Sequence, residues 1–337
     1  MKRKQSGLRI MSRLIVLVKP LSGFMCLAVL LGVLGFLCAI QITVAGSLTL
    51  LTAAKISGGI AIKTGCICII IFAVLRGFLH YGEQACNHYI AFKLLALIRD
   101  KVFKAMRRLS PAKLEGKDKG NLVSVITSDI ELLEVFYAHT ISPTCIAILT
   151  CLIMLIFIGR YSIWLSLVAL AAYITVGAVI PLVSSRLNKN AGMTYRDGSG
   201  ALSGFVLDSM RGLLESIRYN STDKRLEEMD KKTDELNSLQ DRLKKIEGHT
   251  GAVTDIAIIF FSVAMLLTGI ALYQKGVIGF DGMIVSTVSM MSSFGPVAAL
   301  SGLAGNLTHT LAAGERVLGI LDELSLIHIS EPTRLDV

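Results

Sequence analysis

Long apolar runs alternate with polar segments along the whole chain. Five of the runs contain no Asp, Glu, Lys or Arg, and a weaker sixth run carries Lys63 and Arg76. A transmembrane helix needs roughly 20 apolar residues, so each run is long enough to cross a bilayer. The pattern therefore predicts an all-α polytopic membrane protein. The six expected transmembrane helices cover 21–43, 59–80, 141–159, 162–184, 254–274 and 281–304.

The polar segments between the runs are alternately short and long, and the two long ones, 76–142 and 184–250, have 67 residues each. In the first, Leu94 and Ile98 belong to a series of apolar residues at helical spacing, and in the second, 223–247 is densely charged. About 20 helical residues would extend ~30 Å beyond a membrane. We therefore expect two long cytoplasmic helical hairpins, each joined at a tip. The alternative is a solvated charged coiled coil that binds no partner.

Composition and charge argue against a soluble globular protein and against a nucleic-acid partner. Hydrophobic residues make up 53% of the chain and charged residues 18%, which would leave a soluble domain with too much apolar surface. All but four of the 34 Lys and Arg residues lie near the termini or in the two long polar segments. By the positive-inside tendency, both termini are expected to be cytoplasmic in a multi-pass protein of the cell membrane. The net charge of +9 then reflects topology and contact with the lipid bilayer, because no base-stacking aromatic cluster accompanies the basic segments.

The N-terminal segment and the cysteines add little chemistry. Residues 1–19 are expected to form a cytoplasmic segment before a retained first span, because the apolar run that follows is too long for a signal peptide. The seven cysteines are odd in number and lie in or beside apolar runs. We expect them to be buried small hydrophobic residues rather than disulfide partners, and we expect no metal site.

The first long segment carries several short motifs in a fixed order. A leucine-rich helix is followed by a proline turn, a Gly-Asn-Leu step and a Ser-Asp helix start. These motifs are Leu109, Pro111, Gly120-Asn121-Leu122 and Ser128-Asp129. Their order resembles the first cytoplasmic loop of the six-helix ABC exporters.

Two later segments extend the resemblance, which covers about residues 10–323. Leu207–Leu213 is similar to the second coupling helix of these exporters, with Gly212 at the usual glycine. Ala313–Asp322 resembles the stretch that leads from the sixth span to the nucleotide-binding domain. Within the superfamily, Ala91–Arg99 is most similar to the CydC-like permeases, which export thiols such as cysteine and glutathione.

The resemblance implies a coupling device and two partners. In such transporters, short helices at the loop tips dock on ATPase domains, whose dimerisation moves the membrane helices. We therefore expect a nucleotide-binding domain, fused or in trans, and a second transporter half; the subfamily resemblance favours a heterodimer over a homodimer. The residues expected to contact the ATPase domain are Lys113, Leu114, Gly120, Asn121, Leu122, Asp208, Met210, Arg211 and Gly212.

The sequence contains no phosphate-binding loop of the G-x-x-x-x-G-K-[ST] type. The single Gly-Lys step, Gly116-Lys117, is followed by Asp118 in a charged bend. We expect ATP and Mg²⁺ to act only through a missing or partner nucleotide-binding domain, so the chain alone should not hydrolyse ATP and has no catalytic residue. Residues 324–337 match neither the family nor the helical pattern, and we expect them to be a foreign tail on a truncated gene.

Serines in the sixth span form one candidate substrate-binding surface. Ser286, Ser289 and Ser293 share a helical face just before Gly295-Pro296, where we expect a kink. Such a face can line a cavity, or it can serve ordinary small-residue helix packing.

A second polar face lies at the inner end of the second span. Arg76, His80 and Glu83 fall on one side of the helix, and intramembrane charges usually mark a cavity or pair with one another. Arg76 is suited to a substrate carboxylate, because a guanidinium binds a carboxylate with two parallel hydrogen bonds. The alternative is an intrahelical network of side chains that reach toward the interface. The subfamily resemblance also makes His88 a candidate ligand for haem.

Two functions fit these features. The first is the permease half of an ATP-driven exporter, which moves a cysteine- or glutathione-type thiol or another small amphiphile by alternating access. The second is a non-transporting six-helix scaffold or receptor with cytoplasmic coiled coils. The tip motifs favour the exporter, because a scaffold has no need for related turns at the ends of two equal hairpins.

Overall fold

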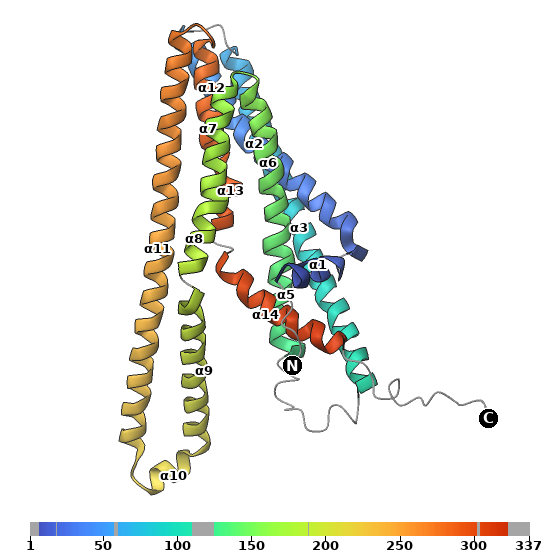
Figure 1. Cartoon of the computed structure of the whole chain (residues 1–337), viewed down its shortest axis with the longest axis vertical. Helices are drawn as coiled ribbons and strands as arrows, with labels where there is room; N and C mark the ends of the chain where they lie inside the picture. Colours follow the sequence, from blue (N-terminus) through green and yellow to red (C-terminus); the bar gives the residue numbers. More distant parts are fainter. Residues whose placement is uncertain are drawn as a thin grey trace, which may run out of the picture.

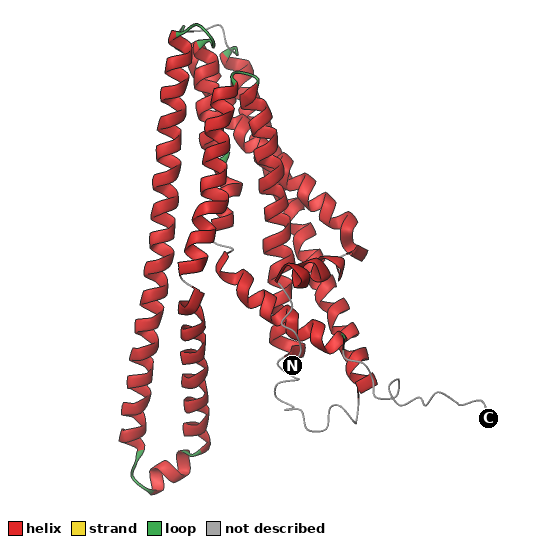
Figure 2. Ribbon diagram, in the orientation of Figure 1, coloured by secondary structure: helices red, strands yellow, loops and turns green. Residues whose placement is uncertain are grey.

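A computed structural model describes the chain except for short segments. The described residues are 7–17, 19–56, 60–109, 125–187, 189–301 and 304–322. All regular elements within these ranges are helical, and none of them is a strand. Six helices are long and apolar enough to cross a membrane, which confirms the predicted all-α polytopic fold. The spans lie together at one end of the molecule, and two stalks extend from them toward the other end (Figures 1 and 2).

The N-terminal half contributes three spans and the first stalk. Its elements are α1 (Gly7–Leu17), η1 (Lys19–Leu21), α2 (Ser22–Ala53), α3 (Ile62–Leu109), η2 (Val125–Asp129), α5 (Ile130–Phe136), η3 (Tyr137–Ile141) and α6 (Ser142–Gly159). The second span is the first part of α3, and the same helix continues without a break as an arm of the stalk. The helical pattern predicted over 90–110 is thus confirmed, and α3 ends two residues before Pro111.

The C-terminal half contributes the other three spans and the second stalk. Its elements are α7 (Ile163–Ile174), η4 (Thr175–Val179), α8 (Ile180–Leu187), α9 (Lys189–Arg211), α10 (Leu213–Arg218), α11 (Thr222–Gln274), α12 (Phe280–Ser292), α13 (Phe294–Ser301) and α14 (Ala304–Leu321). With 53 residues, α11 is about 80 Å long and serves both as the fifth span and as an arm of the second stalk.

The sixth span is interrupted where the sequence predicts a kink. α12 ends at Ser292 and α13 begins at Phe294, so Pro296 occupies the first turn of the new helix. A proline is tolerated there because the first turn of a helix needs no backbone N–H donor. In the interior of one continuous helix, the same residue would remove the hydrogen bond to the Ser292 carbonyl.

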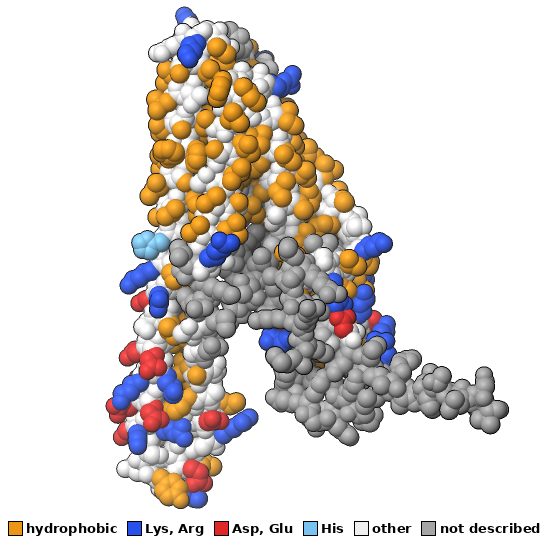
Figure 3. All heavy atoms as spheres, viewed as in Figure 1, with side chains coloured by type: hydrophobic (Ala, Val, Ile, Leu, Met, Phe, Trp, Pro, Cys, Tyr) orange, Lys and Arg blue, Asp and Glu red, His pale blue; other side chains and the backbone are white. Residues whose placement is uncertain are grey.

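Two apolar cores hold the molecule together. The membrane core joins α2, α6, α7, α11 and α12 through residues such as Ile40, Leu165 and Met265. The stalk core joins α1, α3, α5 and α14, and includes Leu94 and Ile98 from the series predicted by sequence spacing. Apolar side chains cover the outer surface of the spans, whereas charged ones gather on the stalks (Figure 3). This distribution places the spans in lipid and the stalks in water.

Candidate functional site

The second stalk ends in a short separate helix. α9 stops at Arg211, the chain breaks at Gly212, and α10 crosses the end of the hairpin (Figure 1). Asp208 and Arg211 lie exposed on the last turns of α9, and the Met210 residue is 70% exposed. The four predicted coupling residues of this loop therefore meet at the tip, but they precede the short helix rather than form it.

Sequence reasoning missed most of the apolar surface of this tip. Leu214 is 79% exposed and Tyr219 76% exposed, and Ile217 is exposed beside them. Met210 is exposed just before the break at Gly212, and the charged Arg218 is exposed next to Tyr219 in the chain. An exposed apolar patch with a polar rim is typical of a protein-docking surface. The leucine pair directly after Gly212 was the signal in the sequence that could have identified it.

The first tip lies outside the described residues. The predicted coupling residues in this loop are Lys113, Leu114, Gly120, Asn121 and Leu122. Their contribution to docking remains a prediction.

Above this loop, an ion pair joins the first stalk to the helix that follows the sixth span. Arg316 Nε donates a hydrogen bond of 2.7 Å to Asp129 Oδ2, and Arg316 Nη2 donates to Asp129 Oδ1. The Asp129 side chain is 2% exposed and the Arg316 side chain 56% exposed. This hydrogen bond raises the pKa of Arg316, which keeps the guanidinium charged. Two-point contacts between a guanidinium and a carboxylate are among the stronger polar interactions.

The partners of this pair come from two motifs that the sequence analysis treated separately. Asp129 was expected to start a helix, and it does precede α5, but its carboxylate does not cap that helix. It turns instead to Arg316, which is 187 positions away in the chain. The Ser128-Asp129 motif and the Ala313–Asp322 stretch therefore each supply one partner of the same contact.

The N-terminal helix α1 closes the same junction, although the sequence analysis did not predict it. Arg13 pairs with Asp322 beyond the end of α14, with a distance of 2.6 Å between Arg13 Nη2 and Asp322 Oδ1. The Tyr137 hydroxyl donates a 2.7 Å hydrogen bond to the Leu14 carbonyl. Burial raises the pKa of Tyr137, so the phenol remains a neutral donor. A Cβ at Gly314 would lie 2.9 Å from Leu14 Cδ1, so a glycine allows α14 to approach α1 closely.

Within the membrane, the predicted polar face of α3 borders a cavity of about 70 Å³ against α2. The cavity is lined by Arg76, His80 and Glu83, which confirms that they share one face. Glu83 is 6% exposed, and its carboxylate lies 3.2 Å from His80 Nδ1 and 3.5 Å from Asn87 Nδ2. A Cβ at Gly32 would overlap the Ile146 side chain and lie 3.2 Å from Glu83 Cδ, so the glycine makes room for both side chains.

Arg76 stands apart from this network. Among the described residues, it forms no ion pair, and it is exposed at the cavity. The expected intrahelical network therefore contains His80 and Glu83, with Asn87 in place of Arg76. An unpaired guanidinium beside a cavity is chemically suited to an anionic group.

The three serines of the sixth span are fully buried between helices. Ser293 Oγ lies 2.5 Å from the Tyr173 hydroxyl, and Ser286 Oγ donates to the Gly282 carbonyl at 2.6 Å. Ser289 Oγ is buried and has no hydrogen-bond partner among the residues that the structure describes. This geometry matches small-residue helix packing, and a cavity-lining role for these serines remains a prediction.

His88 provides a single ring on the surface of α3. The ring is exposed and stacks on Phe92, with 6.2 Å between ring centroids. Haem ligation would require an enclosed slot for the macrocycle beside the histidine, and an exposed ring with one aromatic neighbour does not form one. The residues around His88 thus do not fit haem.

Comparison with known proteins agrees with the six-span architecture. The family model for the ABC transporter transmembrane region matches residues 24–297. A probable ABC transporter ATP-binding/permease protein of Haemophilus influenzae is 41% identical over 99% of this chain. The chain spans 62% of the length of that relative.

More distant relatives share parts of the chain. The glutathione/L-cysteine transport system ATP-binding/permease protein CydC of Haemophilus influenzae is 22% identical over 77% of this chain and 45% of its own length. An ATP-dependent lipid A-core flippase of Shewanella frigidimarina is 29% identical over 36% of this chain and 20% of its own length. The likeness to CydC is therefore distant. Since the family model covers most of the chain, the protein belongs to the ABC transporter transmembrane family.

Proposed function

We propose that this chain is the permease half of an ATP-driven ABC exporter, which moves a small amphiphilic substrate by alternating access. The observation that carries the proposal is the exposed apolar tip around Met210 and Leu214, held away from the membrane at the end of a two-helix hairpin. Such anchors usually dominate the binding energy of an interface. The partner is a nucleotide-binding domain, fused or in trans, that supplies ATP and Mg²⁺.

Movement of the nucleotide-binding domain would be transmitted to the membrane spans by two routes. Through α10, it would displace α9 and α11, which continue into the fourth and fifth spans. Through α14, it would act on the sixth span and, because Arg316 binds Asp129, on the first stalk as well. Packed helices switch between discrete arrangements rather than bend continuously, so both routes can transmit a displacement.

The proposed cargo is a cysteine- or glutathione-type thiol or a related amphiphile that carries a carboxylate. The name of the CydC relative supports this class, and the unpaired Arg76 at the cavity offers a guanidinium for the carboxylate. The flippase relatives support an amphiphilic cargo more generally. The substrate path would include the buried serines of the sixth span, Ser286, Ser289 and Ser293, only if that span rotates during transport.

The working unit would be a dimer of halves in the cell membrane, with the stalks and both termini in the cytoplasm. The family supports dimerisation and a motor partner. The distribution of Lys and Arg supports the orientation. A heterodimer is favoured by the likeness to CydC, whose own name describes one component of a transport system.

ATP hydrolysis in proteoliposomes, with the nucleotide-binding domain supplied, tests the coupling. Leu214→Asp and Leu122→Asp should each lower substrate-stimulated hydrolysis by about tenfold or more, because a charge replaces a buried interface anchor. Asn237→Asp is the matched control: it adds the same charge on an exposed part of α11, about 22 Å along the helix from its tip-side end. Hydrolysis that is indifferent to both leucine variants would reject the docking role.

Uptake of labelled cysteine, glutathione and an unrelated cationic amphiphile into inverted vesicles tests the cargo. Arg76→Gln should lower uptake of the two carboxylate substrates by roughly tenfold and leave the cation unaffected, because about 1.5–3 kcal/mol is typical of a charged hydrogen bond. Lys63→Gln, at an exposed position near the start of α3, is the control. Equal uptake by Arg76→Gln and the parent would exclude carboxylate recognition by this residue.

A further inference from the structure

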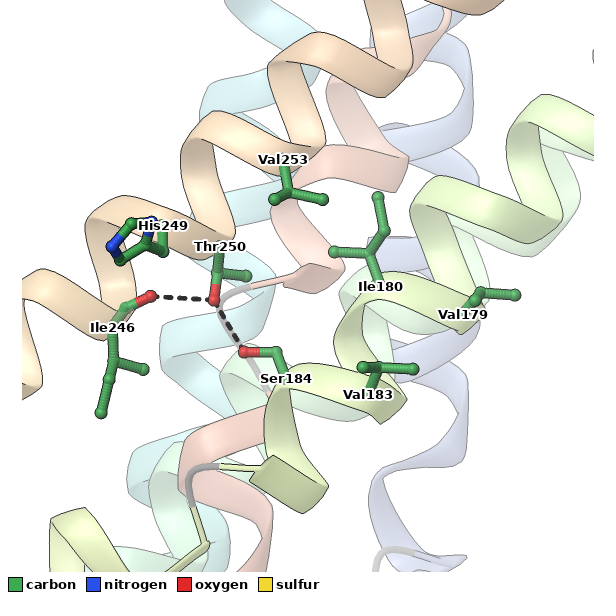
Figure 4. Close-up of a pocket in the computed structure, with 8 residues that line it drawn as sticks. All are labelled: Val179, Ile180, Val183, Ser184, Ile246, His249, Thr250 and Val253. Atoms are coloured by element: carbon green, nitrogen blue, oxygen red, sulfur yellow. Dashed lines mark hydrogen bonds between the residues drawn. The ribbon is translucent and has the colours of Figure 1, made fainter.

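A groove of about 410 Å³ separates the stalk-side ends of the fourth and fifth spans. One wall is formed by Val179, Ile180 and Val183, and the other by Ile246 and Val253 (Figure 4). These are aliphatic side chains, and several are about half exposed. The groove is therefore an apolar surface that the described residues leave uncovered.

Three polar side chains line the groove: Ser184 and Thr250 are paired with one another, and His249 is exposed at its edge. Ser184 Oγ lies 2.7 Å from Thr250 Oγ1, and Thr250 Oγ1 donates a 3.0 Å hydrogen bond to the Ile246 carbonyl (Figure 4). This link ties α8 to α11, so the two hydroxyl groups need no hydrogen bond from an occupant. The chemistry of the walls consequently favours a hydrocarbon chain over a polar solute.

The groove lies at the level where the apolar spans meet the charged stalks. On α8, the uncharged run that started at Tyr161 ends at Ser185, directly after the groove. On α11, the uncharged run begins at Ile256, and the groove lies within the three turns before it. In a bilayer, this is the depth at which acyl chains give way to phosphate headgroups.

Two arginines stand at the headgroup end of the groove. Arg186 follows Val183 by three residues and Val179 by seven, and Arg242 precedes Ile246 by four, so each continues a groove-lining face by helical spacing. Both are exposed, and neither forms an ion pair within the described part of the chain. Glu247, the acidic residue of α11 nearest in sequence to the groove, follows Ile246 directly and thus lies about 100° from it around the helix.

We propose that this groove binds an anionic phospholipid from the leaflet on the stalk side. One acyl chain lies between the valines of α8 and α11, and the phosphate receives hydrogen bonds from Arg186 and Arg242. Basic pockets between transmembrane helices are a recurrent type of site for anionic headgroups, and guanidinium groups bind phosphate oxygens in pairs. The site depends only on membrane insertion and not on the proposed transport activity.

Native mass spectrometry of the full chain tests the site directly. The purified protein is titrated in detergent with an equimolar mixture of phosphatidylglycerol and phosphatidylcholine that carry identical acyl chains. Phosphatidylglycerol should be retained at least fivefold more than phosphatidylcholine. Arg186→Gln and Arg242→Gln should each reduce this preference about fivefold, the usual effect of one cation at a membrane surface. Lys224→Gln, an exposed cation near the distal end of α11, should leave it unchanged.

Groove-filling variants test the acyl-chain contact separately from the charge. Val183→Trp should reduce retention of both lipids, and Val179→Phe serves as a second variant if the first impairs folding. Equal retention of the two lipids, or equal loss in Lys224→Gln, would overturn the proposal. Unchanged lipid binding in both groove-filling variants would also overturn it. If Val183→Trp abolishes a dimer in the mass spectrum while the amount of bound lipid stays constant, the groove binds a second copy of the chain and the proposal is wrong.

Discussion

The first stalk is made of α3 and α5 and is enclosed by α1 and α14, whereas the second is a hairpin of α9 and α11 closed by α10. The first has its own apolar core and two ion pairs that connect distant parts of the chain. In the second, α9 packs mainly on α11, and its tip leaves Met210, Leu214 and Tyr219 exposed. Both leave the same end of the membrane bundle (Figure 1).

This difference shows that two segments of equal length can transmit force in different ways. The first stalk should move as one block with α14, because removing α14 would expose the stalk core and leave Asp129 buried without its partner. The second stalk should pivot at its base, since little besides its own two helices holds it. Variants that loosen the block or strengthen the hairpin can therefore test the comparison.

The largest loss of stability is expected when the charge of Asp129, the buried partner of Arg316, is reversed. Asp129→Arg should lower the free energy of unfolding by about 3 kcal/mol, the lower limit for a broken buried pair, because Arg316 is half exposed and partly solvated. The thermal unfolding midpoint in detergent measures the loss. The double variant Asp129→Arg with Arg316→Asp should recover at least half of it.

A matched pair provides the control for this reversal. Lys104 and Asp100 also form an ion pair on the first stalk, but both side chains are more than half exposed. The corresponding reversal, Asp100→Lys, should change the unfolding midpoint little. If the double variant with the charges exchanged does not recover any of the lost unfolding midpoint, the ion pair does not join α14 to the first stalk.

A smaller loss is expected when the close approach of α14 to α1 is prevented. Gly314→Leu should destabilise the chain by about 1–3 kcal/mol, because its side chain would overlap Leu14 and Leu133 in a packed core. The unfolding midpoint and the exchange rates of backbone amides in α14 measure the effect. Faster exchange should be confined to α1, α5 and α14, and faster exchange in α9 would contradict the separation of the two stalks.

The smallest effect is expected at the outer ion pair. Arg13→Gln should cost less than about 1 kcal/mol, because the Arg13 and Asp322 side chains are each more than a third exposed and are screened by solvent. Increasing the salt concentration should reduce the difference between variant and parent further. A loss as large as that of Asp129→Arg would show that α1 contributes more to the junction than its contacts suggest.

The sequence predicted the features that depend on local periodicity. Leu94, Ile98, Val102 and Ala105 lie at helical spacing and are all buried in the stalk core. The six apolar runs all lie in helices that are long and apolar enough to cross a membrane. Hydrophobic burial follows from the residue types along one helix face, so no knowledge of the partner helix was needed.

Features that depend on the meeting of distant segments were not predicted. Asp129 and Arg316 were assigned to separate motifs, because nothing in either segment indicates which of the 34 cations an acid will contact. The sequence resemblance placed the second coupling helix at Leu207–Leu213, whereas α9 ends at Arg211 and the short helix α10 begins at Leu213. Likewise, helical spacing placed Arg76 beside Glu83 but could not show that Asn87 would take its place as a partner.

Distances between spin labels, measured by pulsed electron paramagnetic resonance, test the central claim most directly. In a variant whose native cysteines are replaced, labels at Lys101 and Glu315 report on the first block, and labels at Lys101 and Asn237 report on the separation of the stalks. The nucleotide-binding domain is supplied, and the ATP-bound and nucleotide-free states are compared. We predict an unchanged distance within the block and a shift of several ångströms between the stalks. A shift within the block, or no shift between the stalks, would contradict the claim.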